Sequence, residues 1–281
     1  MRVRELPDAA EFLAATHDLR AADPVRTNIL GSIARSVADG ARTYDRMFWY
    51  VAEDAGAVVG AAVWTLPHKL VLGPMPPAAA RAIGAAAAGS GAPVHGAMCP
   101  VEIAHDVAIG VGASATVSMG ERILVLGHYL RPPTTVGVAR LVTQDDVEHA
   151  VGWLDQFTTE AGVLVVDNQA AARASLGRLW YWDVDGVPVA MAGHAAVVST
   201  PGAIVARVGP VYTPVPLRGR GYGAAITGAV VEHLLPITDI VMLYTDSANP
   251  TSNALYERLG FAHVADVVDL DLTAPERPSG D

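Results

Sequence analysis

The residues from Val211 to Ala224 combine features that bind a phosphate group. A strand-like run passes through two prolines into a turn with two arginines and three glycines, and an apolar helix follows. The start of a helix leaves backbone N–H groups without partners and carries partial positive charge. Glycine allows the backbone to approach an anion closely, and Arg218 and Arg220 add charge. We therefore predict an anion-binding turn that suits a pyrophosphate.

Two other interpretations of this turn are open. It can be an ordinary surface turn, since short glycine patterns match often. Gly219, Gly221 and Ala224 also fit the dinucleotide fingerprint G-x-G-x-x-G/A, with Asp239 as a ribose ligand. Against this second interpretation, the two prolines break the expected strand-to-turn connection. Asp239 also precedes the predicted strand at Ile240–Tyr244 instead of ending it.

A second polar cluster follows at residues 249–261. Asn249 is a typical N-cap, Pro250 fits the first helical position, and Gly260 fits the position just past the helix end. Ser252 and Tyr256 are four residues apart, so their side chains share one face of this short helix. The pattern predicts a hydroxyl-bearing helix next to the helix of the anion turn.

Together these segments resemble the GNAT superfamily of acyl-CoA-dependent N-acyltransferases. The resemblance rests on the R-x-x-G-x-G/A turn at Arg218, the strand Ile240–Tyr244, and the run N-P-x-S-N-x-x-x-Y-x-x-x-G-F from Asn249 to Phe261. It covers residues 131–281 and implies an α/β fold, with a mixed, mostly antiparallel sheet flanked by helices. The implied activity is transfer of an acetyl group from acetyl-CoA to an amine, without a metal.

The resemblance also implies roles for single residues. The cofactor ligands would be Val211, Tyr212 and Thr213 along the pantetheine arm, Arg218, Gly219, Arg220, Gly221, Tyr222, Gly223 and Ala224 at the pyrophosphate, and Asn249 and Ser252. Tyr256 would act as general acid toward the departing thiolate. Glu160 is the candidate general base, with His194 and Asp246 as alternatives, and a water chain can also carry the proton.

The chain length predicts two domains. Pro132 and Pro133 favour a boundary that separates residues 1–130 from residues 131–281, and the tail from about Thr273 is expected to be disordered. The first half shows a similar order of predicted strands and helices, including a hairpin about Asp54-Ala55-Gly56. It carries Gly73-Pro74-Met75-Pro76-Pro77 where the second half has its basic turn. We interpret it as a degenerate copy of the same fold; an unrelated α/β domain is the alternative.

The composition of the chain disfavours some classes of binding partner. The formal net charge of −10 disfavours nucleic acid, and no apolar run is long enough to span a bilayer. The polar start and the lone Cys99 favour a soluble cytoplasmic protein without disulfides or a cysteine metal site. The expected substrate is a small-molecule amine or a peptide or protein N-terminus. A non-catalytic acyl-CoA sensor or an oligomeric interaction protein remains the alternative, and a homo-oligomer fits either.

Overall fold

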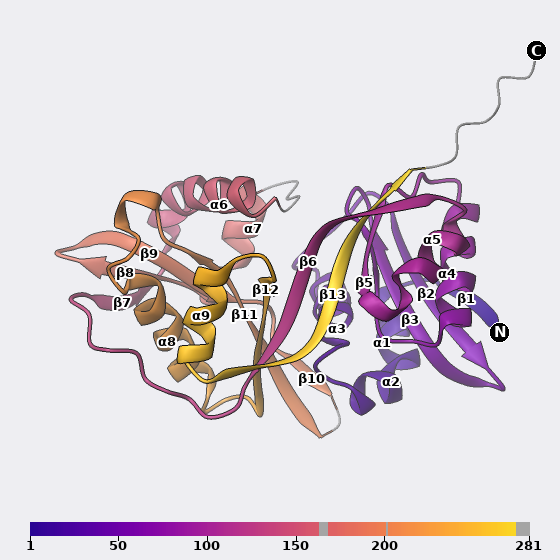
Figure 1. Cartoon of the computed structure of the whole chain (residues 1–281), viewed down its shortest axis with the longest axis horizontal. Helices are drawn as coiled ribbons and strands as arrows, with labels where there is room; N and C mark the ends of the chain where they lie inside the picture. Colours follow the sequence, from indigo (N-terminus) through magenta and orange to yellow (C-terminus); the bar gives the residue numbers. More distant parts are fainter. Residues whose placement is uncertain (163–167, 201, 274–281) are drawn as a thin grey trace, which may run out of the picture. The chain divides into compact units, whose positions relative to one another are not determined.

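The computed structural model describes residues 1–162, 168–200 and 202–273, and the chain forms two compact units (Figure 1). The first unit contains residues 1–123, residues 246–248 and the C-terminal part of the chain from Ala265. The second unit contains residues 124–245 and 249–264. The predicted tail beyond Thr273 lies outside the described residues.

The first unit is a sheet with helices on both faces. Its elements are β1 (Arg2–Leu6), α1 (Ala9–Ala15), α2 (His17–Ala22), α3 (Asn28–Ala38), β2 (Met47–Asp54), β3 (Ala57–Thr65), β4 (Leu70–Leu72), α4 (Pro77–Gly89), β5 (Gly96–Pro100), α5 (Ala104–Val111) and most of β6 (Ser114–Leu126). Its strand order is β1-β2-β3-β4-β5-β13-β6, where β13 is Phe261–Thr273. The predicted hairpin about Ala55 and Gly56 is confirmed, since both residues take positive φ between β2 and β3.

Alternation along β2 explains why both faces of this sheet are covered. Phe48 and Tyr50 join the core beneath α4 and α5, whereas Trp49 and Val51 join the core beneath α1 and α3. Successive side chains of a strand point to opposite faces, so an apolar run without polar interruptions predicts burial on both sides.

The second half of β13 closes the sheet of the first unit. It pairs antiparallel with β5, with Val267 opposite Pro100 and Asp271 opposite Gly96. Its residues Val268, Leu270 and Leu272 are buried in the core that α4 and α5 cover. The observed division therefore differs from the contiguous one expected at residue 131, because β6 and β13 each begin in one unit and end in the other.

The second unit holds the elements predicted for an acyltransferase-like domain. They are β7 (Val138–Leu141), α6 (Val147–Ala161), α7 (Asn168–Ala174), β8 (Leu179–Val184), β9 (Val187–His194), β10 (Val198–Thr200), β11 (Ala203–Tyr212), α8 (Tyr222–Leu234), β12 (Ile240–Asp246) and α9 (Pro250–Arg258). In the order β12-β11-β9-β8-β7, only β11 and β12 are parallel. The predicted mixed, mostly antiparallel sheet is confirmed.

Two helices cover opposite faces of this second sheet. On one face α8 packs on Trp180, Ala190 and Ala192, and on the other α6 packs on Tyr181 and Met191 (Figure 1). Within the described ranges, no helix combines the length and apolar character needed to cross a membrane.

Candidate active site

The strands β11 and β12 part at the end that faces the predicted turn. Their parallel pairing runs from Val205 opposite Ile240 to Val208 opposite Leu243. Beyond Val208 the register of β11 with β9 shifts, at a point where Gly209 has a φ of +144°. Both strands nevertheless continue, β11 to Tyr212 and β12 to Asp246. After this irregularity Val211 and Tyr212 pair again with β9, so the backbone groups of the last residues of β11 that can face the opening are those on the side toward β12.

The turn after β11 leaves backbone amides outside the hydrogen bonds of the following helix. A short 3-10 helix, Val215–Leu217, leads to Gly219 and Gly221, which take φ values of +76° and +83°. Gly221 is the N-cap of α8, and no side chain caps the helix start. The first intrahelical hydrogen bond is that from Ala225 N to Gly221 O, so the preceding amides lie before the helical ladder. The turn is exposed and therefore open to a ligand.

Close packing at Gly223 brings the three predicted motifs together. A Cβ atom built on Gly223 would lie 3.4 Å from the Thr213 hydroxyl and 3.5 Å from a methyl group of Leu255. Thr213 follows β11, Gly223 opens α8, and Leu255 lies on α9. The structure therefore places the end of the strand, the turn and the Asn249–Phe261 helix at one point, as the resemblance implied.

Arg218 braces the turn instead of standing free. Its Nε donates to the carbonyl oxygen of Thr213 at 2.8 Å, and its Nη2 donates to Oε2 of Glu160. Its guanidinium carbon lies 5.9 Å from the ring centroid of Tyr212. Arg220 is exposed and makes a long hydrogen bond of 3.4 Å to the carbonyl oxygen of Pro216. The two arginines of the turn thus differ in how firmly they are held.

Glu160, the predicted base, belongs to this brace. The hydroxyl of Tyr212 donates to Oε1 of Glu160 at 3.0 Å and to Oε1 of Gln156 at 2.8 Å. The bond from Arg218 is the main cause that lowers the pKa of Glu160 below its usual value. A carboxylate stabilised in its charged form accepts a proton less readily, which disfavours the base role.

Tyr256 lies where its phenol stays protonated. It is 8% exposed, and burial raises its pKa to about 12. Its ring meets that of Phe261 edge-on, with 6.1 Å between the centroids. A neutral phenol in a buried setting has the protonation state that a general acid needs at neutral pH. Its acid role stays a prediction.

Asn249 and Ser252 fix the start of α9. Oδ1 of Asn249 accepts a hydrogen bond from the backbone N of Ser252 at 3.1 Å, and Pro250 follows as the first helical residue. The predicted N-cap is confirmed. Contact of these two residues with a cofactor stays a prediction.

His194 and Asp246, the alternative bases, each form a hydrogen bond with a backbone group close to them in the sequence. His194 is buried on the α8 face, where its Nδ1 donates to the carbonyl oxygen of Ala195 at 2.8 Å and its ring lies 5.6 Å from that of Trp180. Burial lowers its pKa. Asp246 accepts a hydrogen bond from the backbone N of Ala248 at 2.8 Å. Neither geometry singles out a base.

Sequence reasoning missed the contribution of Gln156. It lies four residues before Glu160 on α6, so the two side chains share a face and both accept from Tyr212. That spacing was a usable signal. Across the described residues, no group of histidine, cysteine, aspartate and glutamate side chains could hold a metal ion.

Comparison with known proteins agrees with this geometry. Residues 148–261 match the family described as Acetyltransferase (GNAT) family. This segment is a GNAT acetyltransferase domain. No curated protein matches the sequence.

Solved structures resemble the chain over nearly its whole length. An acetyltransferase from the GNAT family of Colwellia psychrerythraea aligns with a TM-score of 0.60 and 12% identity over 97% of this chain and 100% of its own. A tandem GNAT protein from the clavulanic acid biosynthesis pathway aligns with a TM-score of 0.62 and 16% identity over 98% and 99%. At such identities the likeness shows the fold alone, a mixed α/β fold with a mostly antiparallel sheet flanked by helices.

Proposed function

We propose that the second unit is an N-acetyltransferase that moves the acetyl group of acetyl-CoA to an amine of a small molecule or to a peptide or protein N-terminus. The observation that carries this proposal is the exposed glycine turn placed at the mouth of the parting strands β11 and β12. An anion site alone would fit many ligands. A phosphate cradle next to an open strand edge fits a long cofactor with a pyrophosphate at one end and an amide-bearing arm.

Backbone groups do most of the binding in this proposal. The amides from Gly219 to Ala224 hold the pyrophosphate, where glycine at positive φ leaves no Cβ in the way. The main chain of Val211 to Thr213 hydrogen-bonds the pantetheine arm like an added strand. Bound there, the cofactor supplies a thioester, which the second unit directs toward the gap between β11 and β12.

Tyr256 supplies the proton that the leaving sulfur needs. The nitrogen of the acceptor amine attacks the thioester carbonyl carbon, so a C–N bond forms and the C–S bond breaks. The departing thiolate would take the phenolic proton of Tyr256, the amine would release its proton to water, and the tyrosinate would regain a proton from water before the next turnover. A pKa of about 12 keeps this phenol protonated through the neutral range.

We assign Glu160 a positioning role. Its two carboxylate oxygens bind Arg218 and Tyr212, one on each side, so it ties α6 to the turn and to the end of β11. Charge-assisted hydrogen bonds of this kind are strong and directional. The proton of the acceptor amine then leaves through water, with no side-chain base assigned.

Substitution of Tyr256 by Phe tests the proposal. We expect kcat for thiol release to fall by a factor of roughly 10²–10⁴, the usual value of general acid catalysis, while the Kd of acetyl-CoA changes little. Tyr244→Phe is the matched control, because Tyr244 lies on β12 and the proposal gives it no proton to transfer.

The outcomes separate the competing functions. Calorimetry with acetyl-CoA that shows no binding by the unmodified chain would refute the cofactor assignment. Binding without thiol release over a broad panel of amines would instead favour the acyl-CoA sensor.

A further inference from the structure

The edge of the first sheet is open at the start of β6. Within the first unit the strand order ends at β6, and its residues 114–118 are all exposed. They read Ser-Ala-Thr-Val-Ser, without a charge or a proline. An exposed edge strand presents unpaired N–H and C=O groups that accept another strand.

The two end strands of the main sheet order that lie away from β6 carry features that prevent such pairing. At the opposite edge of the first unit, β1 holds Arg2, Arg4 and Glu5. In the second unit the edge strand β7 holds Arg140, whose charge is held by Asp146 and Asp183. Charged side chains are the common means of protecting an edge strand from association. The start of β6 has none.

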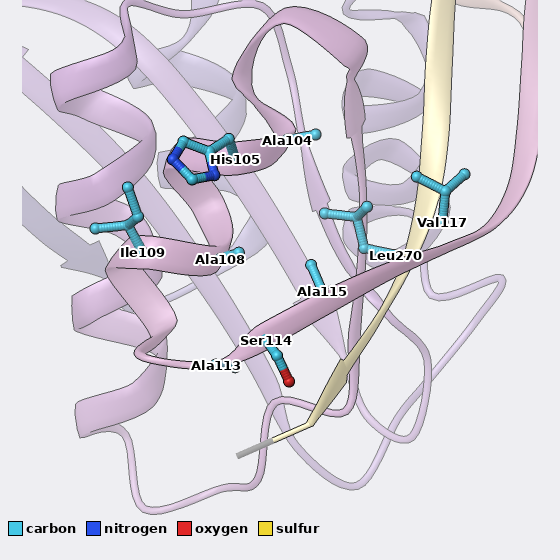
Figure 2. A pocket seen from close by; sticks show the side chains of 9 residues that line it. All are labelled: Ala104, His105, Ala108, Ile109, Ala113, Ser114, Ala115, Val117 and Leu270. Carbon is cyan, nitrogen blue, oxygen red and sulfur yellow. The ribbon is translucent and has the colours of Figure 1, made fainter. Parts of the chain in front are cut away.

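An apolar hollow of about 360 Å³ lies beside this edge. Figure 2 shows Ala115 and Val117 of β6 pointing into it, opposite Ile109 of α5, and Ser114 also lines it. Val117 is 56% exposed and Ile109 is 50% exposed. A strand added along β6 would cover this apolar face of the edge as it satisfies the backbone groups.

We propose that a second copy of this chain occupies the edge, by antiparallel pairing of the two β6 strands about a twofold axis through Thr116. This register places Val117 opposite the partner's Ala115 on the apolar face, so a large side chain meets a small one. On the other face Thr116 meets the partner's Thr116, and Ser114 meets the partner's Ser118. Opposed hydroxyl side chains and complementary sizes stabilise antiparallel pairs, and one patch serves both chains.

The charge of the molecule also favours this patch. Two chains with a formal net charge of −10 repel each other, so a contact between copies is favoured where charge is absent or offset. Two carboxylates near Ser118 share one lysine, since Nζ of Lys69 lies 3.0 Å from Asp271 and 3.9 Å from Asp269 and also binds the Ser118 hydroxyl. Lys69 therefore offsets part of the negative charge at this end of the edge.

A charge placed on the axis tests the proposal. The unmodified chain is expected to sediment as a dimer, and Thr116→Lys should weaken the dimer by about tenfold or more, because two ammonium groups would face each other. Val138→Lys is the control, since Val138 is also exposed and lies on the edge strand β7, so this substitution should leave the dimer intact. A monomeric unmodified chain, or a dimer that Thr116→Lys leaves unchanged, overturns the proposal.

Cross-linking tests the register independently. Directly opposed residues have Cβ atoms about 4.5–5.5 Å apart, so Thr116→Cys should form an intermolecular disulfide when oxidised glutathione removes the two thiol hydrogens. Ser114→Cys should not, because its thiols would lie at opposite ends of the paired segment. The native Cys99 is buried and leaves the result readable. Equal cross-linking of both variants would refute this register.

Discussion

Each unit has a turn that joins a strand to a helix of 13 residues, and the two turns differ in the backbone amides at the helix start. In the first unit the segment from Gly73 to Pro77 joins β4 to α4, with Pro76 as N-cap and Pro77 at the first helical position. In the second unit Gly221 is the N-cap of α8 and Tyr222 follows. Proline has no backbone N–H, so the first unit lacks two amides at the place where the second unit offers them.

Side-chain packing separates the two turns further. Met75 of the first turn packs against β3, where a Cβ atom built on Gly60 would come within 2.7 Å of the Met75 Cβ. In the second unit the corresponding helix start is bordered by Gly219 and Gly221 and is exposed. Both helices have a positive end, and their lengths of 13 residues are equal. A helix dipole alone is therefore not the site, since the free amides and the space next to them decide whether an anion binds.

Among the variants considered, substitution of Gly221 by Ala should cause the largest loss of acetyl-CoA affinity, because it removes the feature that separates the second turn from the first. At a φ of +83° any Cβ strains the backbone, and here it would also lie 3.0 Å from the Thr135 hydroxyl. Loss of two charge-assisted amide contacts costs about 3 kcal/mol, so we expect acetyl-CoA to bind about a hundredfold more weakly in calorimetry.

Gly56→Ala is the matched control for backbone strain. Gly56 has a φ of +87° in the β2–β3 hairpin, with open space around it. It should lower the melting temperature without changing acetyl-CoA affinity. Equal loss of affinity in both variants would show that strain acts through global stability and would count against the cofactor site.

Substitution of Glu160 by Gln should have the next largest effect and distinguishes a brace from a base. As a brace, its loss loosens Arg218, so we expect the KM for acetyl-CoA to rise about tenfold, the effect of roughly 1.4 kcal/mol, with kcat little changed. As a base, its loss would lower kcat and leave KM nearly unchanged.

The pH dependence provides the second readout. The folded chain lowers the pKa of Glu160, so its bond to Arg218 is fully present above the usual glutamate pKa and is lost only as pH falls through the lower, folded value. The KM for acetyl-CoA should therefore rise at acid pH in the unmodified chain and stay flat in Glu160→Gln. An acid limb in kcat that disappears in Glu160→Gln would restore the base role.

Local signals explain what the sequence could predict. Glycine, proline and the Asn249 cap determine the backbone conformation only within a few residues of themselves. The turn and the bounds of α8 and α9 were therefore predictable from the positions of these residues. The ion pair between Arg218 and Glu160 joins residues 58 positions apart, and no local pattern encodes it. Packing of α6 against the end of β11 had to be known before Glu160 could be assigned to the turn.

The sequence also did not predict that β6 and β13 each begin in one unit and end in the other, because no local pattern encodes it. The second half of β13 alternates Val268, Leu270 and Leu272 with aspartates, which predicts a half-buried strand and not the sheet that it joins. The exposed start of β6 is a short mixture of serine and alanine with Thr116 and Val117, and it was not predicted as a strand. Tertiary pairing with β13 decides its conformation.

Replacement of both Pro76 and Pro77 by Ala gives the smallest expected change and completes the comparison. The double variant restores two amides at the start of α4, yet Met75 still packs against Gly60 of β3 and the segment from Gly73 to Pro77 contains no arginine. We expect calorimetry to show one acetyl-CoA per chain before and after the change, with a stability difference within about 1 kcal/mol. Tyr222→Pro, which puts proline at the first helical position of α8, is the reciprocal variant and should weaken the single site. A second equivalent of acetyl-CoA bound by the alanine variant would show that the two prolines alone prevent binding at the first unit. Arginine and glycine in the turn would then not be required for binding.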